Sequence, residues 1–487
     1  MGERTAPPLA HQEAPPAAAV ASDWLAERAA RTPGAVAVEA GGRAWSWAEL
    51  DRQAGRVAAE LRRRGVGEGS RVAVALPAGL GWVALFHACL RLRAVCVPLH
   101  TRLSAGELRR LLEWLEPEAV FGLPWTPPRR RRRPEGTGPG VAAIVTTSGT
   151  TGRPKGVLLT RANLWWNAIA SALHLGSLPG ERWLAVLPLF HVGGLALLTR
   201  SVLLGTALLL RRRFDPAEVN RLVDEGRVQA LSVVATMLER MLGARGGRPF
   251  PPTLRLVLAG GGPVPRPLLE RAQALGCPVL PTYGMTETAS QVVTVPPVPG
   301  GAHPGSAGRP LPFAEVRVVD EALGPLPPGT PGEIAVRGPT VAAGYWRDPA
   351  ATRRAFAGGW LRTGDLGYFD EDGCLFVTGR SDELIVSGGE KIAPAEVEEA
   401  LLAHPAVLEA AVWGVPDPLW GERPRAAVVL RPGARVEAGA LGAWLRERIA
   451  HFKVPERIDV VDRLPRTASG KLRRRLLAAG SPPREEG

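Results

Sequence analysis

Cysteine and long apolar runs are both scarce in this chain of 487 residues. The four cysteines include no C-x-x-C spacing, which argues against a disulfide framework and against a zinc site. The most apolar stretch, residues 195–210, is interrupted by Arg200 and is therefore a poor candidate for a membrane span. Residues 1–21 are rich in alanine and proline but lack the charged-then-apolar pattern of a secretory signal. We therefore expect a cytoplasmic protein with buried, reduced thiols.

Lysine is scarce as well, since it accounts for only 4 of the 60 basic residues. A lysine within a motif is therefore more informative here than general surface charge. The net charge is +13, and residues 129–133 are consecutive arginines, a pattern that can indicate a nucleic-acid or membrane surface. No aromatic residues alternate with this run and no nucleic-acid-binding motif accompanies it, so we expect neither partner. The charge instead favours polyanions such as nucleotides and coenzyme A.

The segment 146–157 combines hydroxyls, glycines and one lysine directly after a short apolar run at 141–145. Glycines let backbone amides approach an anion, hydroxyls donate to phosphate oxygens, and Lys155 adds a compact positive charge. This composition predicts a phosphate-binding loop at the end of a strand, where open α/β sheets bind ligands. A solvated, flexible linker is the alternative. The segment is not the P-loop of kinases and ATPases, because Pro154 precedes the lysine and Gly156 follows it.

The spacing of apolar runs divides the chain into regions with different predicted secondary structure. After a disordered tail, strand and helix patterns alternate, as in doubly wound α/β layers. Further along, short segments between glycines and prolines indicate a β-barrel-like part, and a compact α+β pattern follows it. We predict a tail at 1–20, a large N-terminal domain at 21–379, a hinge at 380–384, a small mobile C-terminal α+β domain at 385–480 and a tail at 481–487.

Residues suited to a nucleotide follow two other apolar runs. The glycines 260–262 either lie flat against a purine or form a plain tight turn. The Tyr283 ring can stack on adenine, although a core position would explain this residue equally. Thr286 can donate to an α-phosphate. Glu287 is a hard oxygen ligand suited to magnesium, which prefers few carboxylates plus phosphates, although an isolated glutamate is more often on the surface.

Six segments together, in the same order, resemble the adenylate-forming superfamily of acyl-CoA synthetases, luciferases and peptide-synthetase adenylation domains. The resemblance covers residues 22–477. The segments are 146–157, 188–191, 283–287, 362–365, 379–382 with 387–390, and 465–471. One match of this kind would be weak, but six in family order are specific. The resemblance implies an enzyme that uses ATP, Mg²⁺ and coenzyme A.

The implied reaction has two steps. A substrate carboxylate attacks the α-phosphate of ATP to give an acyl-adenylate and pyrophosphate, and a thiolate then displaces AMP. Lys471 is implied to reach the reacting carboxylate and α-phosphate, where fixed cations stabilise developing charge. A basic tail is the alternative explanation for this lysine. The small domain carries it and is implied to swing about the hinge residue Asp382 before the thiol enters.

The superfamily pattern assigns residues to each ligand. Asp365 and Arg380 are implied to bind the ribose. The catalytic residues are Lys471, Thr286, Glu287, which is also the metal ligand, and His191. The residues assigned to ATP or AMP are Thr147, Ser148, Gly149, Thr150, Thr151, Gly152, Lys155, Gly260, Gly261, Gly262, Tyr283, Gly284, Thr286, Asp365, Arg380 and Lys471. The residues assigned to coenzyme A are Ser387, Gly388, Gly389 and Lys391, the last standing where many relatives have Asn.

Within the superfamily, the chain most resembles the o-succinylbenzoate–CoA ligase family of menaquinone biosynthesis. The segments are 187–195, 232–238 and 283–291. The resemblance implies conversion of 2-succinylbenzoate, ATP and coenzyme A to 2-succinylbenzoyl-CoA, AMP and pyrophosphate. A ligase for another aryl or short- or medium-chain acid is the alternative, and Lys155 and Lys471 argue against a non-catalytic binding protein. The sequence does not distinguish a monomer from a homo-oligomer.

The acid implied by this resemblance has a second carboxylate that must be recognised without being activated. A buried carboxylate requires a cation or several donors. Arg240 follows a helical pattern beside the expected acyl pocket and is our candidate partner, although pairing with Glu239 or solvent would explain it equally. His191 is expected to orient substrate or gate the thiol tunnel, and Ser290 and Gln291 to form a polar wall. The predicted substrate-binding residues are His191, Gly193, Arg240, Ser290 and Gln291.

Overall fold

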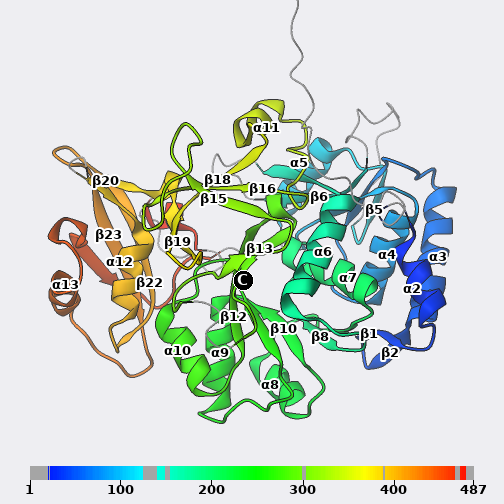
Figure 1. Cartoon of the computed structure of the whole chain (residues 1–487), viewed down its shortest axis with the longest axis horizontal. Helices are drawn as coiled ribbons and strands as arrows, with labels where there is room; N and C mark the ends of the chain where they lie inside the picture. The colour runs from blue at the N-terminus through cyan, green and yellow to red at the C-terminus, as the bar shows by residue number, and fades with distance from the viewer. Residues whose placement is uncertain are drawn as a thin grey trace, which may run out of the picture.

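The computed structural model arranges the chain in four β-sheets with helices packed around them (Figure 1). It describes residues 20, 22–101, 103–123, 140–147, 154–298, 303–387, 390–466 and 472–478. The predictions for residues 1–19, 129–133, 148–152, 388–389, 471 and 481–487 lie outside the described residues.

The first sheet has five strands and carries the start of the predicted phosphate loop. Its strands are β3 (Arg71–Val74), β4 (Val95–Pro98), β5 (Ala119–Phe121), β6 (Val141–Thr147) and β7 (Lys155–Thr160), and the helices of this part are α2 (Trp24–Arg31), α3 (Trp47–Arg63), α4 (Leu80–Arg91) and α5 (Ala105–Leu115). The strand order is β5-β3-β4-β6-β7, with parallel pairing except between β6 and β7. β3 and β4 are buried along their whole length, as expected for parallel strands covered on both faces.

The second sheet has nine strands. They are β1 (Val36–Ala40), β2 (Arg43–Ser46), β8 (Arg182–Ala185), β9 (Ala207–Leu210), β10 (Ala230–Val233), β11 (Leu256–Ala259), β12 (Val279–Met285), β13 (Ser290–Thr294) and β14 (Arg309–Pro310), and the helices are α6 (Arg161–Leu175), α7 (Val192–Leu204), α8 (Pro216–Asp224), α9 (Ala235–Arg245) and α10 (Arg266–Ala274). The order is β14-β13-β12-β11-β10-β8-β9-β1-β2, parallel from β12 to β1. The predicted alternation of strands and helices is confirmed. β13 and β14 differ from expectation, because they extend this sheet by antiparallel pairing instead of opening the barrel-like part.

The third sheet is wholly antiparallel and accounts for the segments rich in glycine and proline. Its elements are β15 (Glu315–Val319), β16 (Gly332–Arg337), α11 (Pro349–Ala355), β17 (Phe356–Ala357), β18 (Trp360–Phe369) and β19 (Leu375–Arg380). Val292 and Val293 of β13 share a buried core with Ile334 and Leu361 of this sheet. The third sheet is therefore packed against the end of the second.

The fourth sheet lies at one end of the molecule and has its own core (Figure 1). Its elements are β20 (Ile385–Ser387), β21 (Glu390–Ile392), α12 (Pro394–Leu402), β22 (Val407–Asp417), β23 (Gly421–Leu430), α13 (Ala438–Arg446), η3 (His451–Lys453), β24 (Arg457–Val460) and α14 (Arg474–Ala478). The 3₁₀ turn η2 (Ser381–Glu383) connects β19 to β20. A large α/β part and a small C-terminal α+β part agree with the predicted fold class, and the exact domain limits stay predictions.

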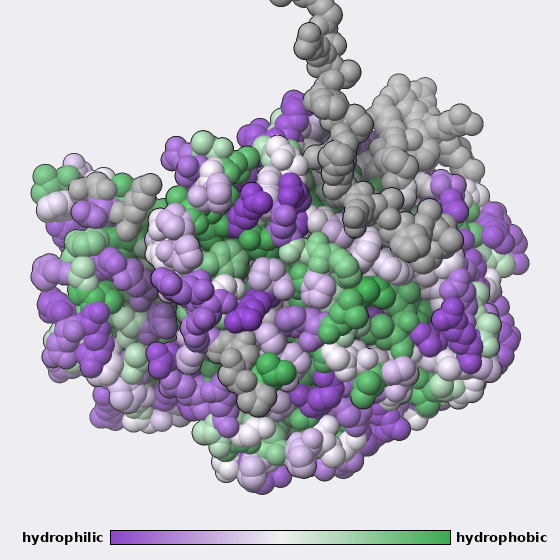
Figure 2. Space-filling view, viewed as in Figure 1, coloured by the Kyte–Doolittle hydropathy of each residue, from purple (hydrophilic) through white to green (hydrophobic). Residues whose placement is uncertain are grey.

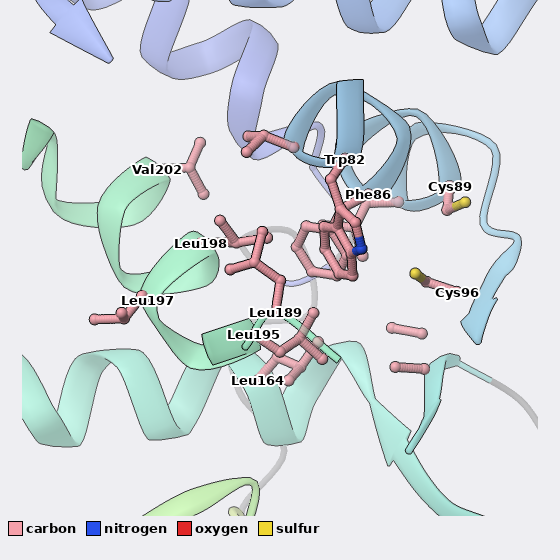
Figure 3. Packing of buried hydrophobic residues seen from close by; sticks show 14 of the residues in the cluster. Trp82, Phe86, Cys89, Cys96, Leu164, Leu189, Leu195, Leu197, Leu198 and Val202 are labelled. Carbon is pink, nitrogen blue, oxygen red and sulfur yellow. The ribbon is translucent and has the colours of Figure 1, made fainter. Parts of the chain in front are cut away.

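A core of tryptophan, phenylalanine and leucine side chains fixes the start of α7 (Figure 3). The rings of Trp82 and Phe86 on α4 are stacked with centroids 6.1 Å apart. Leu189 and Leu195 belong to the same buried cluster and lie on either side of His191 in the sequence. This helix start is therefore anchored by buried neighbours before and after the predicted substrate residue.

The face of the molecule shown in Figure 2 is mainly hydrophilic, with separate hydrophobic areas between the charged residues. None of the helices in the described residues is long and apolar enough to cross a membrane. The four cysteines are free and buried, as expected. Burial raises the pKa of the Cys277 thiol to about 12, so its reactive thiolate form is disfavoured.

His87 gives the fold a specific pH dependence. Its side chain on α4 is 4% exposed, and desolvation lowers its pKa from 6.5 to about 4. Between pH 6.5 and about 4, the unfolded chain binds a proton at this residue that the folded chain does not bind. The contribution of neutral His87 to the free energy of unfolding is therefore fully present above pH 6.5 and is lost as the pH falls toward 4. The shift corresponds to about 3 kcal/mol. We expect His87→Leu to flatten the pH dependence of the free energy of unfolding, measured by urea denaturation; an unchanged slope would contradict this assignment.

Candidate active site

Two strand ends carry residues predicted to bind phosphate. β6 ends at Thr147 and β7 begins at Lys155, and these residues are paired across the antiparallel hairpin. The connecting residues 148–153 lie outside the described part of the chain. At Gly156, a Cβ would lie only 3.1 Å from the Trp346 Cβ. This close packing fixes the start of β7 and therefore the backbone position of Lys155.

One tyrosine contacts both Lys155 and Glu287. Glu287 lies in the 3₁₀ turn η1 (Thr286–Thr288) after β12 and is 7% exposed. The Tyr345 hydroxyl donates to Glu287 Oε1 at 2.9 Å, and Lys155 Nζ lies 5.0 Å from the Tyr345 ring centroid, within cation–π range. Burial and the Glu287 carboxylate raise the pKa of the Tyr345 phenol far above its ordinary value, so it remains a donor. Tyr345 is not among the site residues predicted from the sequence, where its only distinguishing feature is that it is one of three tyrosines.

A second hydrogen-bonded group joins the residues predicted to bind adenine and ribose. Tyr283 Oη donates to Asp365 Oδ2 at 2.8 Å, and Arg380 Nη1 donates to Asp365 Oδ1 at 2.7 Å. Asp365 and Arg380 are directly opposite each other in the β18–β19 pair, whereas Tyr283 comes from β12. Burial and the Asp365 carboxylate raise the pKa of Tyr283 well above its ordinary value. The structure therefore brings together three predicted residues from two sheets.

The turn from β12 to β13 has a demanding backbone geometry. Ala289 and Ser290 have φ values of 56° and 123°, in the region that favours glycine. A Cβ on Gly284 would lie 2.0 Å from the Ser290 carbonyl oxygen, so only glycine fits there. The Thr288 hydroxyl donates to the carbonyls of Met285 at 3.1 Å and Ser290 at 2.8 Å. These contacts fix η1, which carries the predicted α-phosphate donor and magnesium ligand.

The three glycines after β11 have separate physical explanations. A Cβ on Gly260 would lie 2.6 Å from Thr282 Cγ2. Gly261 has a φ of 81°, which an L side chain rarely adopts. Close packing against β12 therefore accounts for Gly260, and a left-handed turn conformation accounts for Gly261. Gly262 has no heavy atom within 4 Å of an added Cβ, and its contact with a purine stays a prediction.

The predicted substrate residues His191 and Gly193 lie at the start of α7. His191 is the residue before the helix, and its ring lies 4.5 Å from the Phe190 ring. Gly193 is followed by Gly194, where a Cβ would lie 2.3 Å from the Pro188 carbonyl oxygen. The second glycine therefore allows α7 to begin directly against the segment that precedes it.

A buried arginine that was not among the predicted site residues supports the predicted polar wall. Gln291 is 4% exposed, and its Oε1 accepts a hydrogen bond from Arg200 Nη2 at 3.1 Å. Arg200 lies on α7 over the Trp183 ring, and burial lowers its pKa to about 10. In the sequence, Arg200 is distinguished only as the charged residue that interrupts the apolar stretch 195–210. The bond joins α7 to β13, two of the three elements that carry predicted substrate residues.

Arg240 lies on α9 and is exposed, with its guanidinium 5.2 Å from the Phe214 ring centroid. The neighbouring Glu239 instead accepts hydrogen bonds from Arg271 at 2.9 and 3.0 Å. The alternative pairing of Arg240 with Glu239 is therefore not formed in the described residues. Within the described residues Arg240 makes no hydrogen bond to Gln291, and its role toward a second carboxylate stays a prediction.

Comparison with known proteins agrees with this arrangement. The sequence matches the family of AMP-binding enzymes over residues 25–139 and 123–346, and the AMP-binding enzyme C-terminal domain over residues 396–471. The chain belongs to the AMP-binding enzyme family. The predicted resemblance to the adenylate-forming superfamily is thereby confirmed.

Relatives of this AMP-binding enzyme include 2-succinylbenzoate–CoA ligases. The chain is 44% identical to 2-succinylbenzoate–CoA ligase from Geobacillus kaustophilus, over 95% of this chain and 99% of that protein. Its structure is similar to that of o-succinylbenzoate CoA synthetase from Bacillus subtilis in complex with the acyl-adenylate intermediate OSB-AMP, with a TM-score of 0.84, 38% identity, and 93% and 97% of the two chains covered. For the complex of the same synthetase with ATP and magnesium ion, the TM-score is 0.83 at 38% identity, and 92% and 98% of the chains are covered.

Glu287 fits the magnesium ion expected in an AMP-binding enzyme of this kind. No group of three or more histidine, cysteine or carboxylate side chains that could hold a metal occurs among the described residues. Mg²⁺ does not require such a group, because waters and substrate phosphates supply most of its ligands. The Tyr345 hydroxyl donates to Oε1 of the buried Glu287 carboxylate, and among the described residues no hydrogen bond occupies Oε2, which can therefore bind an ion. The donor set therefore suits Mg²⁺ bound together with ATP.

A network of ion pairs surrounds the predicted hinge. Asp382 lies in η2 and accepts a hydrogen bond from Arg380 Nε at 2.9 Å. The next residue, Glu383, accepts from Arg474 Nη1 at 2.7 Å, and Arg474 Nη2 also donates to the buried Glu398 at 2.8 Å. Burial raises the pKa of Glu398. The network thus connects the predicted ribose residue Arg380 with the small C-terminal part, and the hinge role of Asp382 stays a prediction.

The loop assigned to coenzyme A is a hairpin between β20 and β21. Ser387 pairs with Glu390 across this hairpin and with Gly421 of β23. Residues 388–389 lie outside the described residues, and so does the side chain of Lys391. The contacts of this loop with coenzyme A therefore stay predictions.

Proposed function

We propose that this AMP-binding enzyme joins 2-succinylbenzoate to coenzyme A at the expense of ATP, releasing AMP and pyrophosphate, as a step of menaquinone biosynthesis. The observation that carries the proposal is the 44% identity to a 2-succinylbenzoate–CoA ligase, which extends over 95% of this chain and 99% of that protein. The site supports it, since Tyr283, Asp365 and Arg380 suit a nucleoside. Lys155 and Glu287 provide a cation and a metal ligand suited to its phosphates.

In the first step, an oxygen of the succinyl carboxylate attacks the α-phosphorus of ATP, and the bond to the pyrophosphate oxygen breaks. We assign Lys155 and Thr286 to the phosphate oxygens, and Lys471, from its sequence position alone, to the charge that develops between the two reactants. The Tyr283 ring packs against adenine, and the Asp365 carboxylate accepts from the ribose hydroxyls. When bound at Glu287, Mg²⁺ neutralises phosphate charge. No protein nucleophile is required.

In the second step, the thiolate of coenzyme A attacks the acyl carbon, and the carbon–oxygen bond to AMP breaks. Lys471 and the loop with Ser387 and Lys391 are all assigned to the C-terminal domain. We propose that rotation about Asp382 withdraws the lysine and brings the loop to the thiol path. Because ATP and coenzyme A are cytoplasmic metabolites, we place the reaction in the cytoplasm.

The second carboxylate of the acid requires polar partners once it is removed from water. We assign Ser290 and Gln291 to this wall, with His191 at its entrance. The Arg200 bond fixes the Gln291 amide, because Oε1 is already occupied as an acceptor. The Gln291 amide nitrogen is therefore the group that we expect to donate toward the acid, with Arg240 contributing through water.

The test is AMP release by the purified protein with ATP, Mg²⁺, coenzyme A and 2-succinylbenzoate, compared with benzoate and a fatty acid. We expect turnover with 2-succinylbenzoate alone. Turnover with only another acid would retain the adenylate mechanism and replace the assigned substrate. Absence of turnover with every acid would contradict the proposed ligase activity.

A further inference from the structure

The segment 342–346 is joined by its backbone to both charged parts of the phosphate site. At one end, Trp346 N donates to the Gly156 carbonyl at 2.7 Å, directly after the predicted phosphate-binding lysine. At the other end, Ala342 N donates to the carbonyl of Glu287 at 2.8 Å. The segment lies between β16 and α11 of the third sheet. It therefore links elements from three different sheets at one place.

Tyr345, in this segment, repeats the connection with its side chain. Its hydroxyl donates to Glu287 Oε1 at 2.9 Å, and its ring centroid lies 5.0 Å from Lys155 Nζ. The residue is 8% exposed. Its backbone N–H donates to Thr352 Oγ1 at 3.0 Å, and its ring packs edge-on against Phe356 with centroids 5.7 Å apart. These contacts restrict both the position and the rotation of the ring.

We infer that Tyr345 is a positioning residue for magnesium-bound ATP, orienting the Glu287 carboxylate toward the metal and the Lys155 ammonium toward the phosphates. The inference rests on the proposed function. Lys155 forms no ion pair with any residue that the structure describes, although Glu287 is bound to the same tyrosine. The ring holds the lysine by a cation–π contact that leaves its charge uncompensated. Both charged groups therefore stay available to the nucleotide and its metal.

The decisive variant is Tyr345→Phe, which removes the hydroxyl and keeps the ring that contacts Lys155. Isothermal titration calorimetry with Mg·ATP, and separately with ATP in EDTA, measures metal-dependent binding without requiring turnover. We expect about tenfold weaker binding of Mg·ATP, because loss of a partner that orients a metal ligand commonly costs that much. Binding of metal-free ATP should be unchanged. Tyr368→Phe is the matched control, since Tyr368 stacks on Phe376 in the β18–β19 pair and contacts neither charged group.

Tyr345→Leu removes the ring as well and should weaken both forms of ATP, because Lys155 then loses its contact. Equal weakening of both forms by Tyr345→Phe, together with a lower melting temperature, would indicate a merely structural role and overturn the inference. Unchanged Mg·ATP binding by Tyr345→Phe would also overturn it. Failure of the proposed function can be distinguished from failure of this inference. In the first case the unmodified protein shows no turnover with 2-succinylbenzoate, and this result does not depend on how the variants bind ATP.

Discussion

Replacing Glu287 by glutamine is expected to lower the rate of ATP–pyrophosphate exchange at least about 100-fold. Glutamine retains a carbonyl oxygen that can accept from the Tyr345 hydroxyl, so the bond of 2.9 Å can persist. It removes the negative charge that makes the side chain a good magnesium ligand. Mutating a residue that only orients a metal ligand commonly lowers activity by up to about 100-fold, so removing the ligand's own charge should lower activity by at least that factor. Exchange with 2-succinylbenzoate, measured against Mg²⁺ concentration, reports the loss.

Glu270→Gln is the matched control for this substitution. Glu270 lies on α10 with its side chain 56% exposed and forms a surface ion pair with Arg266, so the same charge is removed away from the site. Such exposed pairs contribute little to stability, and exchange should remain at the unmodified level. Glu287→Gln should still form the thioester from supplied acyl-adenylate and coenzyme A. Exchange by Glu287→Gln with an unmodified magnesium dependence would exclude Glu287 as the metal ligand.

The alternating fold could be predicted because its signals are local. β3, β4 and β10 are short apolar runs that are buried along their whole length, and glycine- and proline-rich connections separate the later strands. The pairing of strands could not be predicted in the same way. In sequence, β13 and β14 resemble the third sheet, because they are short strands separated by glycines and prolines. They nevertheless belong to the second sheet, where β13 pairs with both β12 and β14. Apolar periodicity indicates that a segment is a strand, but it does not specify which sheet the strand joins, even where the partners are close in sequence, as β12 and β13 are.

The site shows the same division between local and distant information. Tyr283, Asp365 and Arg380 each belong to a recognisable short segment, and the fold then places them in one hydrogen-bonded group. Tyr345 and Arg200 were missed because their roles arise from distant contacts. Tyr345 is 58 residues from its partner Glu287 in the sequence, and Arg200 is 91 residues from Gln291. Composition marked both as unusual, one as a rare tyrosine and one as a charge in an apolar run, but it could not identify their partners.

Replacing Asp365 by asparagine is expected to lower kcat/KM for ATP about 100- to 1000-fold, mainly through a higher KM. The carboxylate already accepts from Tyr283 and Arg380, at 2.8 and 2.7 Å, and each of its oxygens can accept a further bond from a ribose hydroxyl. Hydrogen bonds to a charged group contribute about 1.5–3 kcal/mol each, so two of them account for a loss of this size. Asparagine would also direct an N–H₂ group toward one of the two existing donors. The rate of AMP formation at varied ATP concentration measures the effect.

The control for this prediction is Asp372→Asn, which makes the same substitution at the β18–β19 turn. The Asp372 side chain is 62% exposed and contacts His303 on the surface, so we expect unmodified kinetics. The rate with supplied acyl-adenylate separates a ribose contact from a general disturbance of the sheet. A ribose contact anchors AMP in both half-reactions, so Asp365→Asn should weaken acyl-adenylate binding as well as ATP binding. If only ATP binding were weakened, Asp365 would act on the triphosphate through Arg380 and Tyr283, and the ribose assignment would be wrong.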